Sequence, residues 1–312
     1  MSILPACEAN EKHVAWDGLS LAVPEEWEPG LLGPGSLRLD HRSGPALELR
    51  WAASGGLPAG EQIARAAREL RGARLFRAGE PGVPPDWNRA VRARADKGGR
   101  ADRNVEAEPF AWHDENTASR GLGAALRWRR SGAAALALFF LSPGDESCEL
   151  PGRVLGSLNA HFDEDETPWA VFGLSASVPT RLGLERQEFV PGRFQLLFRQ
   201  RREGFWPLLR PARLVLERFG PASVLLGAGE SRAGGPSPLS LWVEKQYKKP
   251  LPGAGFWQPR ENGLVLRQVG GSSRRMVRHD PGSNKILAVT LREGGREDME
   301  AFERICRNYA TT

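Results

Sequence analysis

The chain has 312 residues, 40% of them hydrophobic, and a formal net charge of +5. Since an ordinary domain has roughly 150 residues, this length favours two domains over one. No apolar run approaches the ~20 residues of a bilayer-spanning helix, so we expect a soluble chain with no membrane partner. The widely spaced cysteines Cys7, Cys148 and Cys306 include no CxxC pair, which disfavours a disulfide framework and a zinc knuckle.

The N-terminal stretch Leu4-Pro5-Ala6-Cys7 is similar to the end of a bacterial lipoprotein signal. Only six residues precede Cys7, and they contain neither a basic start nor an apolar core. We therefore expect a cytoplasmic protein, unless the true start lies upstream and makes Cys7 a lipoprotein cysteine.

The first repeated element is a short phrase. GLSLAVP at 18–24 returns 155 positions later as GLSASVP at 173–179. Apolar residues that alternate and stop at a proline predict a strand with a fixed end. In the first half this strand precedes predicted strands at 36–40 and 46–51, and in the second half predicted strands at 193–199 and 212–219.

The later parts of the two halves also follow the same order. Strands are predicted at 122–130 and 133–141, and then at 264–269, 274–279 and 286–291. Apolar residues at helical spacing predict helices, in chain order, at 61–76, 146–162, 239–247 and 297–309. The chain is thus predicted to be a tandem duplication.

An acidic stretch, Asp163-Glu164-Asp165-Glu166-Thr167-Pro168, separates the two patterns. The predicted domains are 1–162 and 169–312, with 163–168 as an acidic linker. The first domain carries an additional basic segment at 77–104, rich in Pro, Gly and Arg, which we predict to be an exposed loop outside the core.

This order of elements, together with the phrase GLSLAVPEEWEPG, resembles the PsbP-like superfamily of small α/β/α sandwiches. That superfamily includes a photosystem subunit, an adaptor for the nuclear-transport GTPase Ran and bacterial chaperones of secretion effectors. The resemblance implies an α+β fold of two tandem PsbP-like domains, each an antiparallel sheet flanked by helices. It also implies partner binding without catalysis, and it carries over no functional residue.

Candidate catalytic and metal-binding groups are few. The histidine and acidic cluster at 161–165 has no HExxH spacing and no second histidine, so a solvated linker is favoured over a metal site. His113-Asp114 and His279-Asp280 are sequence neighbours, whose side chains point to opposite faces of a strand. There is no GxSxG motif. We predict no catalytic residue, no metal and no cofactor.

The chain has ten tryptophans against two tyrosines. Three of the tryptophans lie in Pro-, Gly- and Arg-rich contexts typical of loops, where Trp and Arg together favour a binding hot spot. Folding of these rings back onto their own domain is the equal alternative. The candidate partner-binding residues are Trp87, Trp206, Trp257, Arg201 and Arg202.

We therefore predict a non-enzymatic cytoplasmic binding or adaptor protein with a protein partner. One alternative is a nucleic-acid-associated protein that uses the basic segments 77–104, 199–202 and 245–249, although arginine in this chain is dispersed and Arg-rich composition alone decides nothing. The other alternative is a hydrolase whose site is not visible in the sequence.

Overall fold

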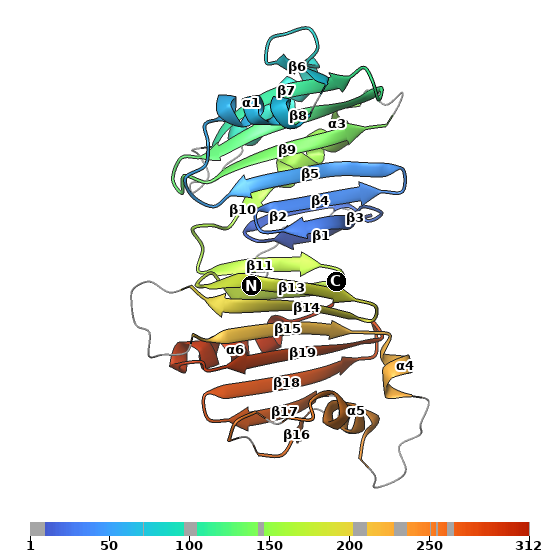
Figure 1. Cartoon of the computed structure of the whole chain (residues 1–312), viewed down its shortest axis with the longest axis vertical. Coiled ribbons are helices and arrows are strands. Elements are labelled where there is room, and N and C mark those ends of the chain that lie inside the picture. Colours follow the sequence, from blue (N-terminus) through green and yellow to red (C-terminus); the bar gives the residue numbers. More distant parts are fainter. Residues whose placement is uncertain are drawn as a thin grey trace. The chain divides into compact units, whose positions relative to one another are not determined.

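The computed structural model describes residues 10–70, 72–96, 105–142, 147–201, 211–227, 236–249, 251–253, 255–260 and 265–311. The chain divides into two compact units, unit 1 (Met1–Glu164) and unit 2 (Asp165–Thr312). Figure 1 colours the chain from its N-terminus to its C-terminus and labels most of the elements.

Unit 1 contains a seven-stranded antiparallel sheet and a separate hairpin. The hairpin joins β1 (Glu11–Trp16) to β2 (Leu19–Pro24), and the short strand β10 (Asn159–Ala160) pairs with β2. The sheet has the order β3-β4-β5-β9-β8-β7-β6. Its strands are β3 (Glu28–Gly33), β4 (Ser36–His41), β5 (Gly44–Ala52), β6 (Ala73–Arg77), β7 (Val105–Asp114), β8 (Ser119–Trp128) and β9 (Ala134–Leu141).

Helices cover both faces of this sheet. On one face, α1 (Ala59–Glu69) packs Ile63 and Ala66 against Leu136 and Leu138 of β9. The opposite face carries α2 (Pro85–Asp96), whose Trp87 meets the Phe139 ring edge-on, and α3 (Glu149–Ser157), which contacts α2. Alternate residues of β9 point to opposite faces, which is how one strand serves both layers.

Unit 2 has a sheet with the corresponding order, β13-β14-β15-β19-β18-β17-β16. It also begins with a hairpin, β11 (Glu166–Val171) and β12 (Leu174–Pro179). The sheet strands are β13 (Leu182–Val190), β14 (Arg193–Gln200), β15 (Arg213–Phe219), β16 (Gln258–Arg260), β17 (Val265–Gly270), β18 (Ser273–Asp280) and β19 (Lys285–Arg292).

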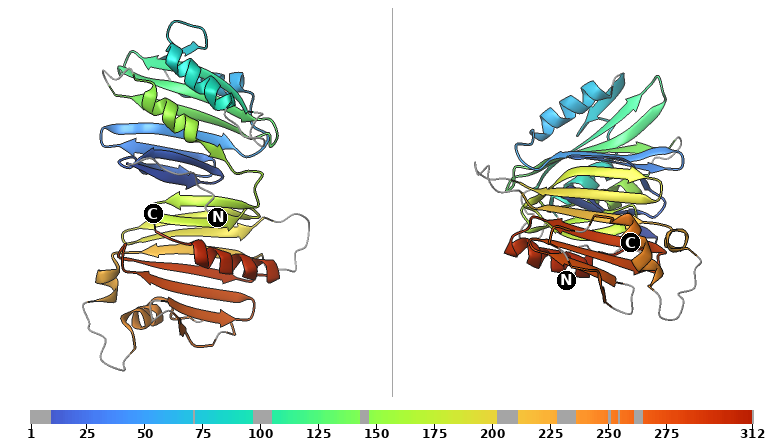
Figure 2. Two further views of the ribbon diagram at one scale, coloured as in Figure 1. Left: turned by 180° about the vertical axis from the view of Figure 1, so that it is seen from behind. Right: turned by 60° about the horizontal axis from the view of Figure 1, so that its bottom comes forward.

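The unit 2 sheet also carries helices on both faces. On one, which we call the α5 face, α5 (Pro238–Gln246) follows α4 (Ala222–Leu226) and packs Trp242 and Val243 against Phe219 and Ala288. The other face carries α6 (Arg296–Asn308), dark red in the left view of Figure 2, which contacts β12, β18 and β19.

The repeated phrase makes the same turn in both units. Asp17 and Gly18 between β1 and β2 have φ values of 44° and 93°, and Phe172 and Gly173 between β11 and β12 have values of 51° and 67°. Two central residues with positive φ are the mark of a two-residue hairpin turn whose twist matches its strands. The conserved spacing within the phrase therefore corresponds to one hairpin, built twice.

The predicted fold class is wrong. Strands hold 49% of the described residues and helices 22%, so the fold is dominated by its sheets, and the few helices packed on them do not make it the predicted α+β sandwich. The prediction missed the interior strand β7 and the edge strands β3 and β13, of which the two edge strands have mostly half-buried or exposed side chains with little alternation. It also extended the 61–76 helix through β6.

The prediction of a loop at 77–104 is wrong for residues 85–96, which form α2. Trp87 and Val91 of this helix are fully buried, and Arg94 is 3% exposed with a hydrogen bond of 2.6 Å from Nη2 to the Leu158 carbonyl. Three buried residues at i, i+4 and i+7 anchor an otherwise polar helix, because they lie on one face. Residues 97–104 lie outside the described part of the chain.

Candidate functional site

The three tryptophans predicted to contact a partner lie in different settings. Trp87 is fully buried and donates its indole N–H to the Gly123 carbonyl at 2.9 Å. It offers no surface to a partner, so this part of the prediction is wrong. Trp257 is half-buried against Tyr247, with ring centroids 6.1 Å apart. Trp206 lies outside the described residues.

The two predicted arginines lie where the description of the chain stops after β14. Arg201 is exposed, and its backbone N–H donates to the Arg181 carbonyl at 2.9 Å. Arg202 lies outside the described residues. The structure thus places Arg201 at the end of a strand and brings it together with none of the described tryptophans.

Ser20, His161 and Glu164 of unit 1 contact one another in the sequence serine, histidine, carboxylate that is typical of a catalytic triad. Ser20 Oγ lies 2.7 Å from His161 Nε2, and His161 Nδ1 lies 2.9 Å from Glu164 Oε2, although the angle of this second contact is poor for a hydrogen bond. Ser20 has no exposed surface and His161 is 4% exposed. A nucleophile must reach its substrate. In this structure the Ser20 hydroxyl is closed to a substrate and serves to satisfy a buried histidine.

Within the described ranges, no group of three or more His, Cys, Asp or Glu side chains is arranged to hold a metal ion. Nor does any described helix have the length and apolarity needed to span a membrane. Cys306 is buried in α6, and desolvation raises the pKa of its thiol to about 12. It is therefore protonated and unreactive near neutral pH.

Unit 1 contains a cavity of about 260 Å³ beside α1. Its charged residues already have partners, because Arg50 Nε lies 2.5 Å from Glu48 and Arg65 Nε lies 2.9 Å from Glu69. A cleft of about 890 Å³ elsewhere in unit 1 is lined by several glutamates and by Arg153, which pairs with Glu11 at 3.0 Å. The cavity beside α1 therefore presents no unpaired charge that would select a ligand.

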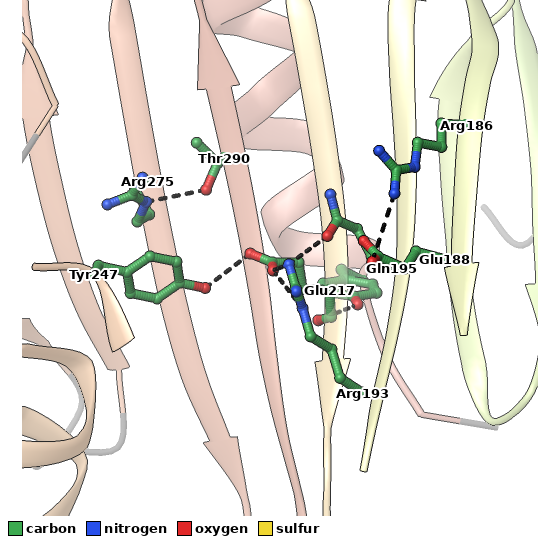
Figure 3. A network of polar contacts seen from close by, with 9 residues as sticks. Arg186, Glu188, Arg193, Gln195, Glu217, Tyr247, Arg275 and Thr290 are labelled. Carbon is green, nitrogen blue, oxygen red and sulfur yellow. Dashed lines mark hydrogen bonds and ion pairs between the residues drawn. The ribbon is translucent and has the colours of Figure 1, made fainter. Parts of the chain in front are cut away.

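The α5 face of unit 2 contains a buried polar network, drawn in Figure 3. At its centre Glu217 is 4% exposed. One of its carboxylate oxygens accepts from Arg193 at 2.7 and 3.1 Å, and the other accepts from the Tyr247 hydroxyl at 2.8 Å. Both oxygens are thus satisfied, as a buried carboxylate requires.

Arg275 adjoins this network on β18 and is 3% exposed. Its Nε donates to Thr290 Oγ1 at 3.1 Å, and its guanidinium carbon lies 4.2 Å from the centre of the Tyr247 ring. Burial lowers the pKa of Arg275, and burial also raises the pKa of Tyr247 well above its usual value, an effect to which Glu217 adds. At neutral pH the tyrosine is therefore neutral, and Arg275 retains its charge because an arginine titrates far above pH 7.

Three further arginines cross the same face in one line. Arg199 of β14 is directly opposite Arg213 of β15, which is directly opposite Arg292 of β19. We call Arg199, Arg213 and Arg292 the arginine row. All three are exposed. Arg199 has Glu185 at 3.4 Å, but among the described residues neither the Arg213 nor the Arg292 side chain has an ion pair or hydrogen bond.

Like charges directly opposite each other destabilise a sheet pair. In the arginine row this arrangement occurs twice in succession, across β14, β15 and β19. Such a row is chemically suited to hold an anion, because guanidinium groups donate two parallel hydrogen bonds to carboxylate or phosphate oxygens.

The sequence pointed to one member of the arginine row, Arg199. It marked 199–202 and 245–249 as basic segments but did not identify Arg213, Arg275 or Arg292. No sequence signal marks these three arginines as one site, since they belong to three separate predicted strands or their ends, and Arg275 is one of two adjacent arginines. The proximity of Arg213 to Arg292 depends on pairing between strands that are about eighty residues apart in the chain.

Comparisons with known proteins add little. No family model and no curated protein sequence matches the chain, so the PsbP-like resemblance stays a prediction. One solved structure, of a protein from Bacteroides thetaiotaomicron, is similar at 14% sequence identity with a TM-score of 0.31. The match covers 55% of this chain and 54% of that one, so this chain spans about half of its length. A likeness at this level carries no argument about fold or function.

Proposed function

We propose that this chain is a non-enzymatic binding protein and that the α5 face of unit 2 contacts an anionic partner. The observation that supports this proposal is the arginine row, in which Arg213 and Arg292 are exposed, directly opposite and without an acidic partner among the described residues. Folding alone gains nothing from this arrangement, whereas an anionic partner would offset the repulsion.

The partner class that we favour is a protein with an acidic segment. Trp257 packs against the apolar cluster of the α5 face, beside Tyr247, and keeps part of its surface exposed. A half-exposed Trp near arginines is the combination most enriched in protein-binding hot spots. The chain would then act as an adaptor, with Trp257 as an apolar anchor and the arginine row as the charged part of the contact.

A nucleic acid is the second candidate, and one observation favours it. Lys248 and Lys249 directly follow Tyr247, whose ring lies on Arg275, so the basic segment 245–249 reaches the same sheet face as the arginine row. Two of the three basic segments named from the sequence thus belong to unit 2, and Arg199 of one of them is in the arginine row. Phosphate contacts from such residues would give sequence-independent binding with a steep salt dependence.

Titration of the purified chain with two labelled probes tests the proposal: a glutamate-rich peptide, and mixed-sequence DNA in single-stranded and duplex form. The adaptor proposal predicts binding of the peptide that weakens about tenfold or more in Arg199→Gln/Arg213→Gln and in Trp257→Ala. Arg307→Gln is the matched control, because Arg307 is exposed on α6 at the opposite face.

Two results would count against the adaptor proposal. DNA binding whose log affinity falls with log salt at a slope near 0.9 per neutralised phosphate, together with loss in Lys248→Gln/Lys249→Gln, would replace it with the nucleic-acid candidate. No binding of either probe at low salt would show that the α5 face contacts neither an acidic protein segment nor a nucleic acid.

A further inference from the structure

Arg275 is the one described guanidinium on the α5 face that is buried and incompletely bonded. Its Nε has Thr290 as acceptor, but its Nη1 is buried and has no hydrogen-bond partner among the described residues. A buried donor without a partner costs about 1–3 kcal/mol, and more when it belongs to a charged group. An acceptor that the chain itself does not supply would remove this cost.

The charges around Arg275 leave it without an ion pair. Glu217 favours its charged form from a distance, but both carboxylate oxygens of Glu217 are occupied by Arg193 and Tyr247. Arg292 acts in the opposite direction and lowers the pKa of Arg275 by repulsion. The described part of the chain therefore places a desolvated positive charge next to a second one.

The strand register brings Arg292 and Arg213 to Arg275. Thr290 is directly opposite Arg275, and Arg292 is two residues further along the same face of β19. Two residues of a strand span about 6.6 Å, which is within the reach of two arginine side chains. Arg213 is directly opposite Arg292 on the neighbouring strand. Three guanidinium groups from three adjacent strands can thus converge on one small ligand.

We propose that Arg213, Arg275 and Arg292 form an oxyanion subsite that takes the phosphate group of a phosphorylated compound. Arg275 is its floor and is held in place by Thr290 and by the Tyr247 ring, while Arg213 and Arg292 form its exposed rim. A phosphate monoester carries about two negative charges at neutral pH and several acceptor oxygens, so it matches three guanidinium groups better than a single carboxylate does. This inference rests on the proposed function, since it specifies one subsite on the same face.

One group within the chain competes for the free donor of Arg275. Gln268 of β17 is directly opposite Arg275, is 4% exposed, and its Oε1 is also buried without a partner. A small rotation of either side chain would let Oε1 accept from Nη1. In that case Arg275 would need no external anion, and phosphate would have no more effect than chloride.

Thermal unfolding of the whole chain in increasing inorganic phosphate, at constant ionic strength and about pH 7.5, tests the subsite. A bound anion raises the unfolding temperature in a saturable way, whereas general salting-out by phosphate rises without saturation. We expect saturable stabilisation of the wild type and an apparent affinity at least about tenfold weaker in Arg292→Gln and Arg213→Gln. Arg307→Gln should keep the wild-type response.

Two further comparisons identify the source of the phosphate and distinguish the phosphate subsite from the proposed binding of an acidic protein. A small phosphomonoester such as glycerol 2-phosphate should bind at least as tightly as inorganic phosphate if the natural ligand is esterified, and more weakly if it is free phosphate. Equal responses of wild type, Arg292→Gln and Arg213→Gln would overturn the subsite even if the acidic peptide binds. Saturable phosphate binding that these variants lose would support it even if no peptide or DNA binds.

Discussion

The two sheets differ most clearly in how they pair charge across strands. In unit 1, Arg38 of β4 is directly opposite Glu48 of β5, and Arg50 on the same strand lies 2.5 Å from Glu48. In unit 2, at the corresponding pair of strands, Arg199 is opposite Arg213. The strand order is the same in both sheets, so topology does not dictate the charge pattern on the surface.

This difference indicates which part of each sheet is free to vary. The buried residues of both central strands, such as Leu47 and Leu49 in β5 and Leu214 and Leu216 in β15, are apolar and alternate in the same way. The alternate positions on the other face of each strand differ. In β5, Glu48 and Arg50 are half-buried and form an ion pair, whereas in β15 the exposed Arg213 is opposite an arginine on each side.

The units also differ in a helix. In unit 1, α2 lies between β6 and β7 and is anchored by Trp87. In unit 2, only residues 261–264 separate β16 from β17, which is too short a connection for such a helix. The basic segment that the sequence marked as an insertion is therefore in part a structural element specific to unit 1.

The largest effect is expected from Trp87→Ala. This substitution removes a fully buried ring from between α2 and the sheet and leaves the Gly123 carbonyl without its donor, so it should lower the free energy of unfolding by about 3–5 kcal/mol. Urea denaturation followed by circular dichroism measures this change. Trp257→Ala, at a half-buried position, should cost less. If Trp87→Ala and Trp257→Ala lower the free energy of unfolding equally, then α2 is dispensable and the two units are more alike than their structures indicate.

A similar loss is expected from Glu217→Ala, this time in unit 2. The substitution leaves Arg193 and Arg275 without the one buried carboxylate of their network, and breaking a buried pair in this way costs about 3–5 kcal/mol. Glu185→Ala removes an exposed partner of Arg199 and should cost less than about 1 kcal/mol. If both variants unfold at the same urea concentration, the network does not hold the α5 face together.

Unit 2 should be the more sensitive unit at alkaline pH. The pKa of Cys306 is about 12 in the folded chain against an ordinary value of 9.0, so the folded state keeps a proton that the unfolded chain releases. The contribution of this proton to the free energy of unfolding is complete below pH 9, and it is lost from pH 9 to 12 at about 1.4 kcal/mol per pH unit. Burial raises the pKa of Tyr309 in the same direction.

Unfolding temperatures measured from pH 8 to pH 11 check this expectation. Cys306→Ala should weaken the decline above pH 9, whereas Cys148→Ala in unit 1, at a half-buried thiol, should leave the slope unchanged. A decline that is identical in both variants and the wild type would show that ionisation of Cys306 is not the cause.

The smallest effect gives the most direct test of the contrast in charge pairing. In chloride buffer, Arg213→Glu replaces a like-charge pair on each side by an opposite-charge pair, and should raise the free energy of unfolding by about 0.2–1 kcal/mol. Arg38→Glu in unit 1 places a carboxylate opposite Glu48 and should lower it by a similar amount. Effects of the same sign in the two variants would show that cross-strand charge does not distinguish the sheets.

Much of the strand pattern was predictable from the sequence. The repeated phrase predicted β2 and β12, and alternation of apolar residues predicted β4, β5, β9, β14, β15 and β19. The helices over 239–247 and 297–309 are confirmed as α5 and α6 within a residue or two. These elements were accessible because each has a buried face, and a buried face requires a periodic apolar pattern that can be read locally.

The edge strands and α2 were not predictable in this way. β3 and β13 bury little, so their residues show no strong period. α2 is mostly polar, and three buried residues are too few to distinguish it from a basic loop. Pairing with a neighbouring strand, or packing on a sheet formed elsewhere in the chain, supplies the stability that such segments lack by themselves.

The sequence by itself determined the hairpin that opens each unit, since Asp17-Gly18 and Phe172-Gly173 carry the turn and the alternating residues carry the strands. Only the tertiary structure decided the candidate site. Arg213 and Arg292 become neighbours through the register of β15 on β19, in which the buried Leu214 and Leu216 are opposite the buried Leu291 and Val289. Because a shift of one residue would move every side chain to the other face, no local pattern around either arginine could reveal that they meet.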